Sequence, residues 1–276
     1  MEFKALALVL YLEFKALALV LYLEFKALAL VLLNGMIFDN IIILMIFFRY
    51  HSRPINILAL MTISLLVWLI YMATSYGIAD VFAEQAHYEM QQWSAKKLTS
   101  ETWTSTQTRL QNALQLDPQN PDLLEMMGEI YYWKAQKISL TLPAKIIAYQ
   151  QALDYFLQAT KKRPTSSLTW GNVLMMKNVL KQYDTQFLMA LKQTTIQGPS
   201  NPFVHRVVTE IGLSSWQQLS KKGQSLVLMT IERGFVGKEA KQIENLIKKY
   251  RRESVICQYS QQYQNFSTFC ENFRSF

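Results

Sequence analysis

The sequence contains few of the residues from which catalytic and metal centres are commonly built. Its 276 residues include only two cysteines and three histidines, His51, His87 and His205. Two cysteines are too few for a multi-cysteine zinc site or a disulfide-dense scaffold. Because a metal site needs several convergent donors, an isolated histidine is more typical of a packed or solvated residue. Nine glycines and seven prolines exclude a collagen-like or loop-dominated chain.

Common catalytic and nucleotide-binding signatures are also missing. The chain has no glycine-rich phosphate loop, no dinucleotide fingerprint, no zinc-protease helix motif and no nucleophile elbow. Glu125 and Glu129 lie four residues apart on one helix face, a spacing typical of a solvated surface. Carboxyls that hydrolyse a glycosidic bond instead flank it from two sides. We therefore expect no enzyme, no catalytic residues, no metal and no other cofactor.

What the chain does have is an apolar first part that begins with a repeat. Over 2–34 the 11-residue segment EFKALALVLYL occurs three times, and only the last two residues of the third copy differ. Structural repeats usually keep a pattern rather than every residue, so we interpret 1–35 as a recent duplication or an artefact, with Met36 as an alternative start. The other reading is one continuous helix with its lysines along a stripe.

A longer uncharged segment predicts a transmembrane helix over 55–79. The 26 residues of 54–79 carry no charge, and about 20 mainly apolar residues cross the hydrocarbon core of a bilayer. The preceding segment, 36–54, contains an apolar run and a basic loop. A second membrane helix over 27–48 stays open, although the charge of Asp39 is costly at membrane depth.

Charges beside the predicted transmembrane helix indicate its direction. Arg49 and Arg53 precede it, whereas Asp80 and Glu84 follow it. Because arginine and lysine are enriched on cytoplasmic loops, everything after about residue 79 is predicted to lie outside, which in a bacterium is the periplasmic side of the inner membrane. A cleaved signal peptide is the alternative, but the long preceding region argues against it.

Residues 80–252 are predicted to form an all-α domain of paired helices. The stretch 110–133, LQNALQLDPQNPDLLEMMGEIYYW, resembles the tetratricopeptide repeat (TPR), a helix–turn–helix unit of 34 residues. In such a unit a small residue lets two helices approach closely, and large residues fill the seam. The matching residues are Leu110, Ala113, Pro118, Leu124, Gly128, Tyr131, Ala152, Phe156, Ala159, Pro164 and Trp170. The predicted fold class is therefore all-α, a transmembrane helix followed by a TPR-like helix-pair solenoid.

The repeat match is interrupted by an insertion. Gly128 and Ala152 are about 12 residues further apart than the regular repeat allows. Pro143 inside the extra segment 134–149 predicts a longer loop or a broken helix there. Further helices are expected over 201–220, 220–235 and 237–252.

The tail over 253–276 contains both cysteines of the chain. If the domain lies outside, the oxidising compartment favours a disulfide between Cys257 and Cys270. A closed loop of about 15 residues contributes roughly 3 kcal/mol. In a cytoplasmic domain the same two residues would instead be free buried thiols.

The first helix of each predicted pair is expected to line a concave groove that binds another protein. The groove residues are Asp122, Glu125, Met126, Glu129, Tyr132, Trp133, Asn172, Met175 and Asn178. Tyrosine and tryptophan are common anchors of protein interfaces. The sequence leaves open whether Tyr132 and Trp133 serve this purpose or pack against the 134–149 segment.

The order of several segments resembles one protein family. A membrane helix precedes a short helix containing EMQQWSAKK and then ALQLDPQNPDLLEMMGEIYYW. RPTSSLTWGNVLMMK, GPSNPFVHRVVTEIGLSSWQQLS, LVLMTIERG and a cysteine-containing tail follow. Over 55–276 the chain resembles the VpsP-like proteins of bacterial exopolysaccharide gene clusters. The repeat over 1–35 departs from that family.

The resemblance implies a membrane-anchored scaffold that assists exopolysaccharide biosynthesis or export. Its expected partners are the lipid bilayer and other envelope proteins of a polysaccharide assembly system, and no nucleic acid. An alternative is an assembly factor for another envelope system, such as cytochrome c maturation, because such factors also join membrane helices to helical repeats.

Overall fold

The structure, a computed structural model, describes residues 55–93 and 98–274. The predictions for 1–54, which include the repeat over 1–35 and the second membrane helix over 27–48, lie outside these residues. Within the described part the fold is all-helical, with eleven α-helices, one 3-10 helix and no strand. The predicted all-α class is confirmed for these residues.

The chain forms two compact units, and the boundary between them falls inside a helix. Unit 1 comprises Met1–Tyr71 and unit 2 comprises Met72–Phe276. The elements are α3 (Ile55–Gln92), α4 (Ser100–Leu116), α5 (Pro121–Lys137), α6 (Leu142–Lys162), α7 (Ser167–Val179), α8 (Thr185–Gln197), α9 (Pro202–Ser214), η2 (Trp216–Gln218), α10 (Lys221–Val236), α11 (Ala240–Lys249), α12 (Glu253–Cys257) and α13 (Gln264–Arg274).

Helix α3 is longer than the helix predicted over 55–79. It continues without a break to Gln92, so the segment 89–92, expected in a separate short helix, forms its last turn. Among the described helices, α3 is the one that is long and apolar enough to cross a membrane, judged by length and composition. The prediction ended the helix where charges begin at Asp80, but an amphipathic helix continues through charged residues when one face is buried.

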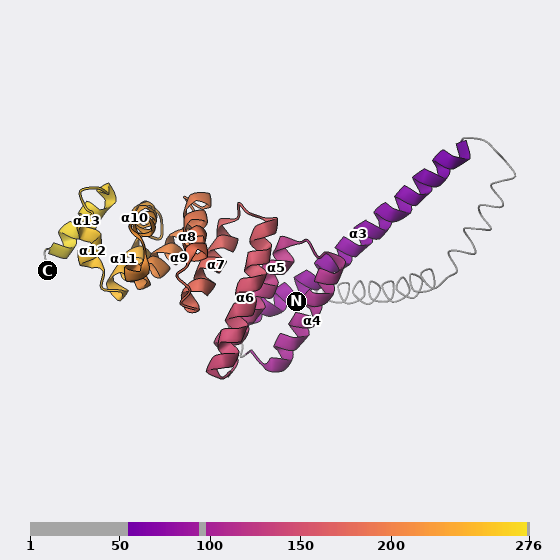
Figure 1. The fold of residues 1–276 in the computed structure, drawn as a ribbon, viewed down its shortest axis with the longest axis horizontal. Coiled ribbons are helices and arrows are strands. Elements are labelled where there is room, and N and C mark those ends of the chain that lie inside the picture. Colours follow the sequence, from indigo (N-terminus) through magenta and orange to yellow (C-terminus); the bar gives the residue numbers. More distant parts are fainter. Residues whose placement is uncertain (1–54, 94–97, 275–276) are drawn as a thin grey trace, which may run out of the picture. The chain divides into compact units, whose positions relative to one another are not determined.

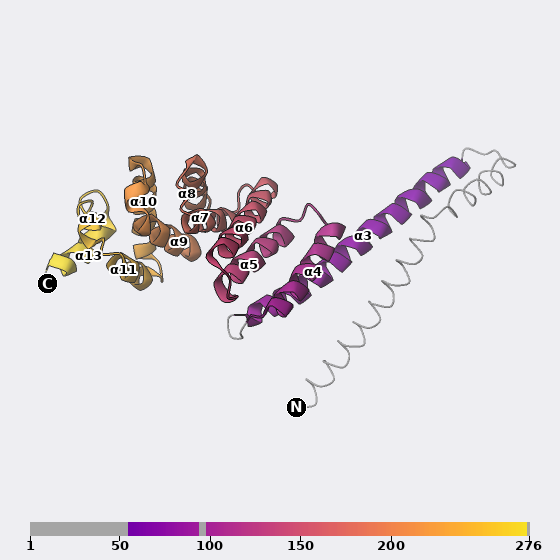
Figure 2. The same cartoon turned by 60° about the horizontal axis from the view of Figure 1, so that its bottom comes forward.

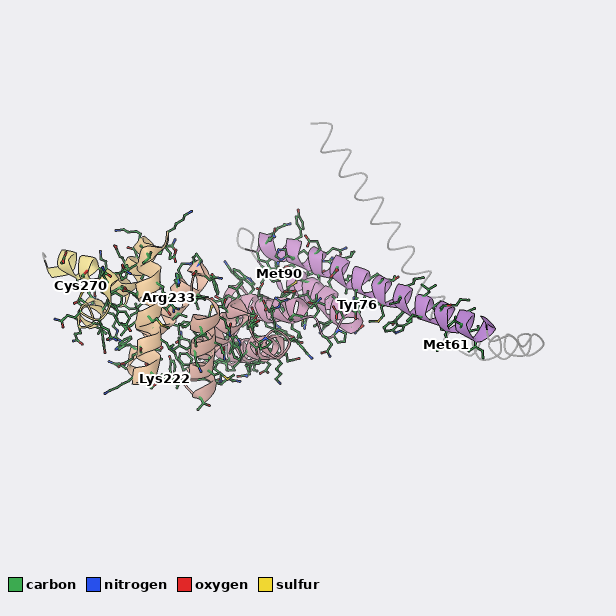
Figure 3. All side chains as sticks on the ribbon, turned by 90° about the horizontal axis from the view of Figure 1, so that it is seen from above. Met61, Tyr76, Met90, Lys222, Arg233 and Cys270 are labelled. Carbon is green, nitrogen blue, oxygen red and sulfur yellow. A yellow bond between two sulfur atoms is a disulfide. The ribbon has the colours of Figure 1, made fainter. Side chains whose placement is uncertain are left out.

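The burial of the α3 side chains changes along its length. Every side chain from Ile57 to Tyr71 is exposed. In unit 2 one stripe is buried, at the spacing of a helix that packs on one face. The residues of this stripe are Ser75, Ala79, Ala86, Met90 and Trp93. Figure 3 labels Met61 in the exposed part of α3 and Met90 in the buried stripe.

Helices that follow one another in the chain lie next to one another in unit 2 (Figures 1 and 2). The pairs α5–α6 and α7–α8 make the most extensive contacts. Contacts also join α7 to α9, α8 to α10, and α9 to α11. One continuous apolar core runs through unit 2 from Ala79 to Cys270. First- and second-neighbour contacts of this kind are typical of stacked helix pairs.

Short polar loops end one helix and begin the next. At six helix starts a side-chain oxygen accepts a hydrogen bond from a backbone amide of the first turn, which stabilises the helix end. These N-cap residues are Thr99, Asn120, Ser166, Asp184, Asn201 and Ser220. Pro121 and Pro202 occupy the first turns of α5 and α9, where the absent amide hydrogen has no helical partner.

The extra residues over 134–149 lengthen two helices. Helix α5 continues to Lys137, and α6 begins at Leu142. Pro143 lies in the first turn of α6, a position that tolerates proline. The prediction of a longer loop or a broken helix is therefore wrong, because this proline marks the start of a helix.

Small residues at the helix seams allow close approaches. Three glycines each face a side chain of another helix so closely that a β-carbon on the glycine would be in very close contact with that side chain. The distance from that β-carbon to the side chain is 2.6 Å for Gly128 with Phe156 and 3.1 Å for Gly171 with Phe203, and Gly212 with Val227 forms the third such pair. The three glycines belong to α5, α7 and α9 and are 43 and 41 residues apart. Apart from Pro118 and Pro164, which lie in loops, the residues predicted to fill the seam are all buried.

A disulfide between Cys257 and Cys270 joins α12 to α13, with the α-carbons 5.6 Å apart. Helix α13 also packs on α10 through aromatic rings. The centroids of Phe266 and Phe269 lie 5.8 and 5.6 Å from that of Phe235. The disulfide therefore connects α12 to a helix that is itself part of the core.

Removal of this disulfide is expected to loosen the C-terminal helices and to leave the rest of unit 2 folded. Reduction, or Cys257→Ser with Cys270→Ser, should lower the free energy of opening of this segment by about 3 kcal/mol, the value for a closed loop of about 15 residues. Native-state hydrogen exchange at the Phe266 and Phe269 amides measures this, with the amides of α5 and α6 as reference. Equal protection of the two amides before and after reduction would contradict the expectation.

Candidate functional site

Helix α5 presents a polar and aromatic face opposite its buried side. The buried side consists of Leu123, Leu124, Met127, Ile130 and other core residues. All the predicted groove residues of α5 and α7 are exposed or partly exposed. We call them the α5–α7 face, which comprises Asp122, Glu125, Met126, Glu129, Tyr132 and Trp133 of α5 and Asn172, Met175 and Asn178 of α7.

Polar contacts hold the acidic part of the α5–α7 face in place. The hydroxyl of Thr169, a fully buried residue of α7, donates a hydrogen bond to the Glu125 carboxylate. Arg163 donates to Asp122 at 2.7 Å, and the two form an ion pair. Asp122 therefore has a cation beside it, whereas Glu125 is held by a neutral hydroxyl at the junction of α5 and α7.

Burial raises the pKa of Glu125 and of Glu129, because it removes their carboxylates from water. For Glu125, the Thr169 hydrogen bond and the Arg163 charge partly oppose this effect. For Glu129, the charge of Glu125 adds to the effect, and His87 of α3 opposes it. Within the described part of the chain, Glu129 makes no hydrogen bond or ion pair. The face thus holds two carboxylates whose charge is incompletely compensated, and a basic group from outside would compensate it.

Tyr132 contacts the 134–149 segment and also lies near α9. Its ring centroid is 6.3 Å from that of Tyr149 and 5.9 Å from that of Trp133. Burial raises the pKa of Tyr132, and the Glu210 carboxylate raises it further, so the phenol lies within electrostatic reach of α9. Both rings of the Tyr132–Trp133 pair stay partly exposed. Tyr132 therefore packs on Tyr149 of the 134–149 segment, and it remains partly accessible together with Trp133.

A pocket with a volume of about 420 Å³ lies between α9 and α11, and it was not predicted. Its lining residues are Phe203, Arg206, Val207 and Glu210 of α9 and Gln242, Asn245, Leu246 and Lys249 of α11. Glu210 accepts hydrogen bonds from Lys249 at 2.7 Å and from the Tyr250 hydroxyl at 3.2 Å. These bonds tie the C-terminal end of α11 to α9 beside the pocket.

The charge of Glu210, which lines the α9–α11 pocket, raises the pKa of Tyr132 on the α5–α7 face. The glycine period is the signal that could have predicted this. Glu210 stands two residues before Gly212, as Met126 stands two residues before Gly128. Glu210 of α9 is therefore equivalent in position to Met126, which belongs to the α5–α7 face. The shorter period of the regular TPR concealed this correspondence.

The chemistry that this arrangement offers is recognition of another molecule. Partly buried carboxylates, accessible aromatic rings and a mixed polar and apolar pocket lie on neighbouring helices. Among the residues that the structure describes, no three histidine, cysteine, aspartate or glutamate side chains converge to hold a metal ion. Comparison of the chain with known protein families, with curated proteins and with solved structures finds no match.

Proposed function

We propose that this protein is a membrane-anchored, TPR-like scaffold that binds a basic and apolar segment of another envelope protein. The observation that carries the proposal is the pair of carboxylates on Glu125 and Glu129. Burial raises the pKa of both, and they lie on the same face as Tyr132 and Trp133. In the partner, a lysine or arginine would pair with the carboxylates, and apolar side chains beside it would pack on the aromatic rings of this face.

Support for the TPR-like architecture comes from the repetition in unit 2. Second-neighbour contacts join α7 to α9 and α8 to α10. One glycine in each of α5, α7 and α9 allows a large side chain of a neighbouring helix to approach closely. The repeating unit is then 41 to 43 residues long, because that is the spacing of these glycines.

Support for membrane anchoring comes from the first half of α3. Its large apolar side chains are exposed at successive positions from Ile57 to Tyr71, a pattern that suits lipid and is unfavourable in water. In this proposal Arg49 and Arg53 keep the preceding segment in the cytoplasm, and unit 2 is periplasmic. A disulfide between Cys257 and Cys270 fits the oxidising periplasm.

The proposed process is exopolysaccharide biosynthesis or export, in which the protein acts by binding and not as an enzyme. This assignment rests on the resemblance of 55–276 to the VpsP-like proteins. The α5–α7 face suits the role because it offers recognition chemistry on a domain held close to the membrane.

The proposal is tested by purifying the full chain from the membranes of its host after chemical cross-linking and quantifying bound proteins by mass spectrometry. Tyr132→Ala with Trp133→Ala should reduce recovery of the partner roughly tenfold or more, since aromatic anchors commonly dominate interface energy. The matched control, Met189→Ala with Ile196→Ala, removes two exposed apolar side chains of α8 and should leave recovery unchanged.

Two outcomes of this experiment would overturn different parts of the proposal. Undiminished recovery with the aromatic variant would contradict the binding face. A partner that handles haem instead of polysaccharide would leave the face intact but contradict the assignment to exopolysaccharide assembly, and would favour cytochrome c maturation.

Glu129→Gln is expected to stabilise the protein while weakening partner binding. A carboxyl group whose pKa is raised in the folded state lowers stability above that pKa, and the penalty disappears as the pH falls below its ordinary value. Thermal unfolding at about pH 7 should therefore show a higher midpoint for the variant, with a smaller difference in acid. A lower midpoint for Glu129→Gln at neutral pH would show that this carboxylate stabilises the fold.

A further inference from the structure

The ends of α5 and α6 carry an apolar surface that no described helix covers. Leu142, Ile146 and Ile147 are 71, 49 and 60% exposed. Elsewhere in unit 2, among the described residues of α4 to α13, the large exposed apolar side chains occur singly along the chain. We call this region the α5–α6 tip, defined by Lys137, Leu142, Lys145, Ile146 and Ile147.

The lengths of the helices explain this exposure. Helices α5 and α6 contain 17 and 21 residues, whereas α7, α8 and α9 contain 13 each. A helix rises about 1.5 Å per residue, so α6 is roughly 12 Å longer than α7, α8 and α9. The additional turns come from the 134–149 insertion. Helix–helix packing within unit 2 therefore does not account for the apolar side chains at the tip.

The tip is also basic. From Ile130 to Leu153 the chain contains three lysines, Lys134, Lys137 and Lys145, and no acidic residue. Lys134 lies over the ring of Trp103, 3.7 Å from its centroid. Within the described residues, neither Lys137 nor Lys145 makes an ion pair. The Lys137 ammonium lies over the Trp133 ring, 5.5 Å from its centroid. An apolar strip beside lysines that have no acidic partner is complementary to a surface that is apolar and acidic.

The tip lies at the end of unit 2 where α3 ends. The Trp103 indole, in the first turn of α4, donates to the Ile130 carbonyl in α5 at 2.8 Å. Helix α4 also contacts α3 near the C-terminal end of α3, where the Thr106 hydroxyl donates a hydrogen bond to the Glu89 carboxylate at 2.6 Å. The tip therefore lies on the side of α4 and α5 that is near the C-terminal end of α3, and its lysines favour an acidic protein segment as the occupant.

We propose that the α5–α6 tip is a second docking site, which receives an acidic amphipathic helix of another envelope protein. Leu142, Ile146 and Ile147 form a strip at helical spacing that matches the apolar face of such a helix. Acidic residues beside that face would pair with Lys137 and Lys145. Two copies of this chain that met tip to tip would bring lysines together, which is unfavourable. The tip adjoins the α5–α7 face, because Lys137 lies over the Trp133 ring, but the two surfaces differ in the sign of their charge.

The test is photo-cross-linking of the full chain in its host cells, with a photoreactive amino acid in place of Ile147 or, as control, Met189 in α8. We expect a protein adduct at position 147 and none of the same mass at 189. The cross-linked peptide of the partner should be acidic with apolar residues at helical spacing. Lys137→Glu with Lys145→Glu should lower the adduct yield roughly tenfold, as reversal of two contacting charges predicts.

A second charge reversal, made away from the tip, tests whether the loss of adduct depends on the tip lysines or on the net charge of the chain. Lys221→Glu with Lys222→Glu, at the exposed start of α10 (Figure 3), changes the net charge equally and should leave the yield unchanged. A lipid adduct, an adduct with a second copy of this chain, no adduct, or equal losses in the two lysine variants would each overturn the proposal. Loss of partner binding in the Tyr132 and Trp133 variant, with the adduct at 147 retained, would show that the two sites act separately.

Discussion

The free energy of unfolding is expected to fall by about 3 kcal/mol when Glu239 is replaced by alanine, because a ring nitrogen of His205 is left buried without its hydrogen-bond partner. His205 and Glu239 are 4 and 6% exposed, and His205 Nδ1 is hydrogen-bonded to the Glu239 carboxylate. The second ring nitrogen, Nε2, lies 2.9 Å from the Pro199 carbonyl oxygen. Both ring nitrogens of the buried imidazole therefore have an oxygen within hydrogen-bond distance.

The same ion pair makes stability depend on pH. Burial alone would raise the pKa of Glu239, but the His205 hydrogen bond, a backbone amide and the charges of His205 and Arg206 outweigh it, and the pKa lies below its ordinary value. The stability from a lowered carboxyl pKa is fully present above the unfolded-state pKa and is lost as the pH falls through the folded value. The unfolding curves of wild type and Glu239→Ala should therefore differ at about pH 7 and converge towards about pH 3.

A second ion pair on α11 provides the control for this prediction. Lys241 and Glu244 are 3.4 Å apart, and the lysine is largely exposed. Glu244→Ala should therefore change the free energy of unfolding by less than about 0.5 kcal/mol. Equal effects of the Glu239 and Glu244 substitutions in urea denaturation would contradict the role given to the buried pair.

Gly128→Val should cost about 3 kcal/mol, since overfilling a packed core commonly costs up to this amount. A β-carbon at this position would lie 2.6 Å from the ring of Phe156. That ring is 1% exposed and therefore has little room to move away. The expected loss corresponds to a fall of roughly 6 to 12 °C in the unfolding midpoint of a domain of this size. Thermal unfolding of the full chain in detergent measures this.

Two further variants test whether contact between the added side chain and Phe156 causes the loss of stability. Gly77 in α3 has no atom within 4 Å of a β-carbon position, so Gly77→Val should change stability by less than about 0.5 kcal/mol. Phe156→Leu should recover part of the loss when combined with Gly128→Val, because it removes the ring that the valine would meet. Additive losses in the double variant would contradict a direct contact between the two positions.

The parts of this fold that depend on local periodicity could be predicted from the sequence. The contact between Gly128 and Phe156 followed from residue sizes at repeat spacing, and the exposed face of α5 followed from the remaining positions of the same helix. A disulfide between Cys257 and Cys270 was predicted on the condition that the domain lies outside, and the two residues are bonded on consecutive helices. In each case the relevant residues belong to one helix or to consecutive helices.

The parts that depend on distant segments could not be predicted. Glu210 and Lys249 meet across the α9–α11 pocket although they lie on helices separated by α10. Pro143 was ambiguous because the same residue breaks a helix from within and is tolerated in its first turn. The end of α3 was predicted too early, at residue 79 instead of Gln92, for a comparable reason. Charges from Asp80 onward signal the end of an apolar run, but the helix continues because unit 2 buries one of its faces.

We propose that α3 crosses the membrane and that unit 2 lies on the oxidising side. Alkaline phosphatase fused after Phe276 measures this most directly, because the enzyme becomes active only outside the cytoplasm, and a green fluorescent protein fusion at the same position provides the opposite readout. We expect phosphatase activity without fluorescence. Fluorescence without phosphatase activity would contradict it and would place unit 2 in the cytoplasm.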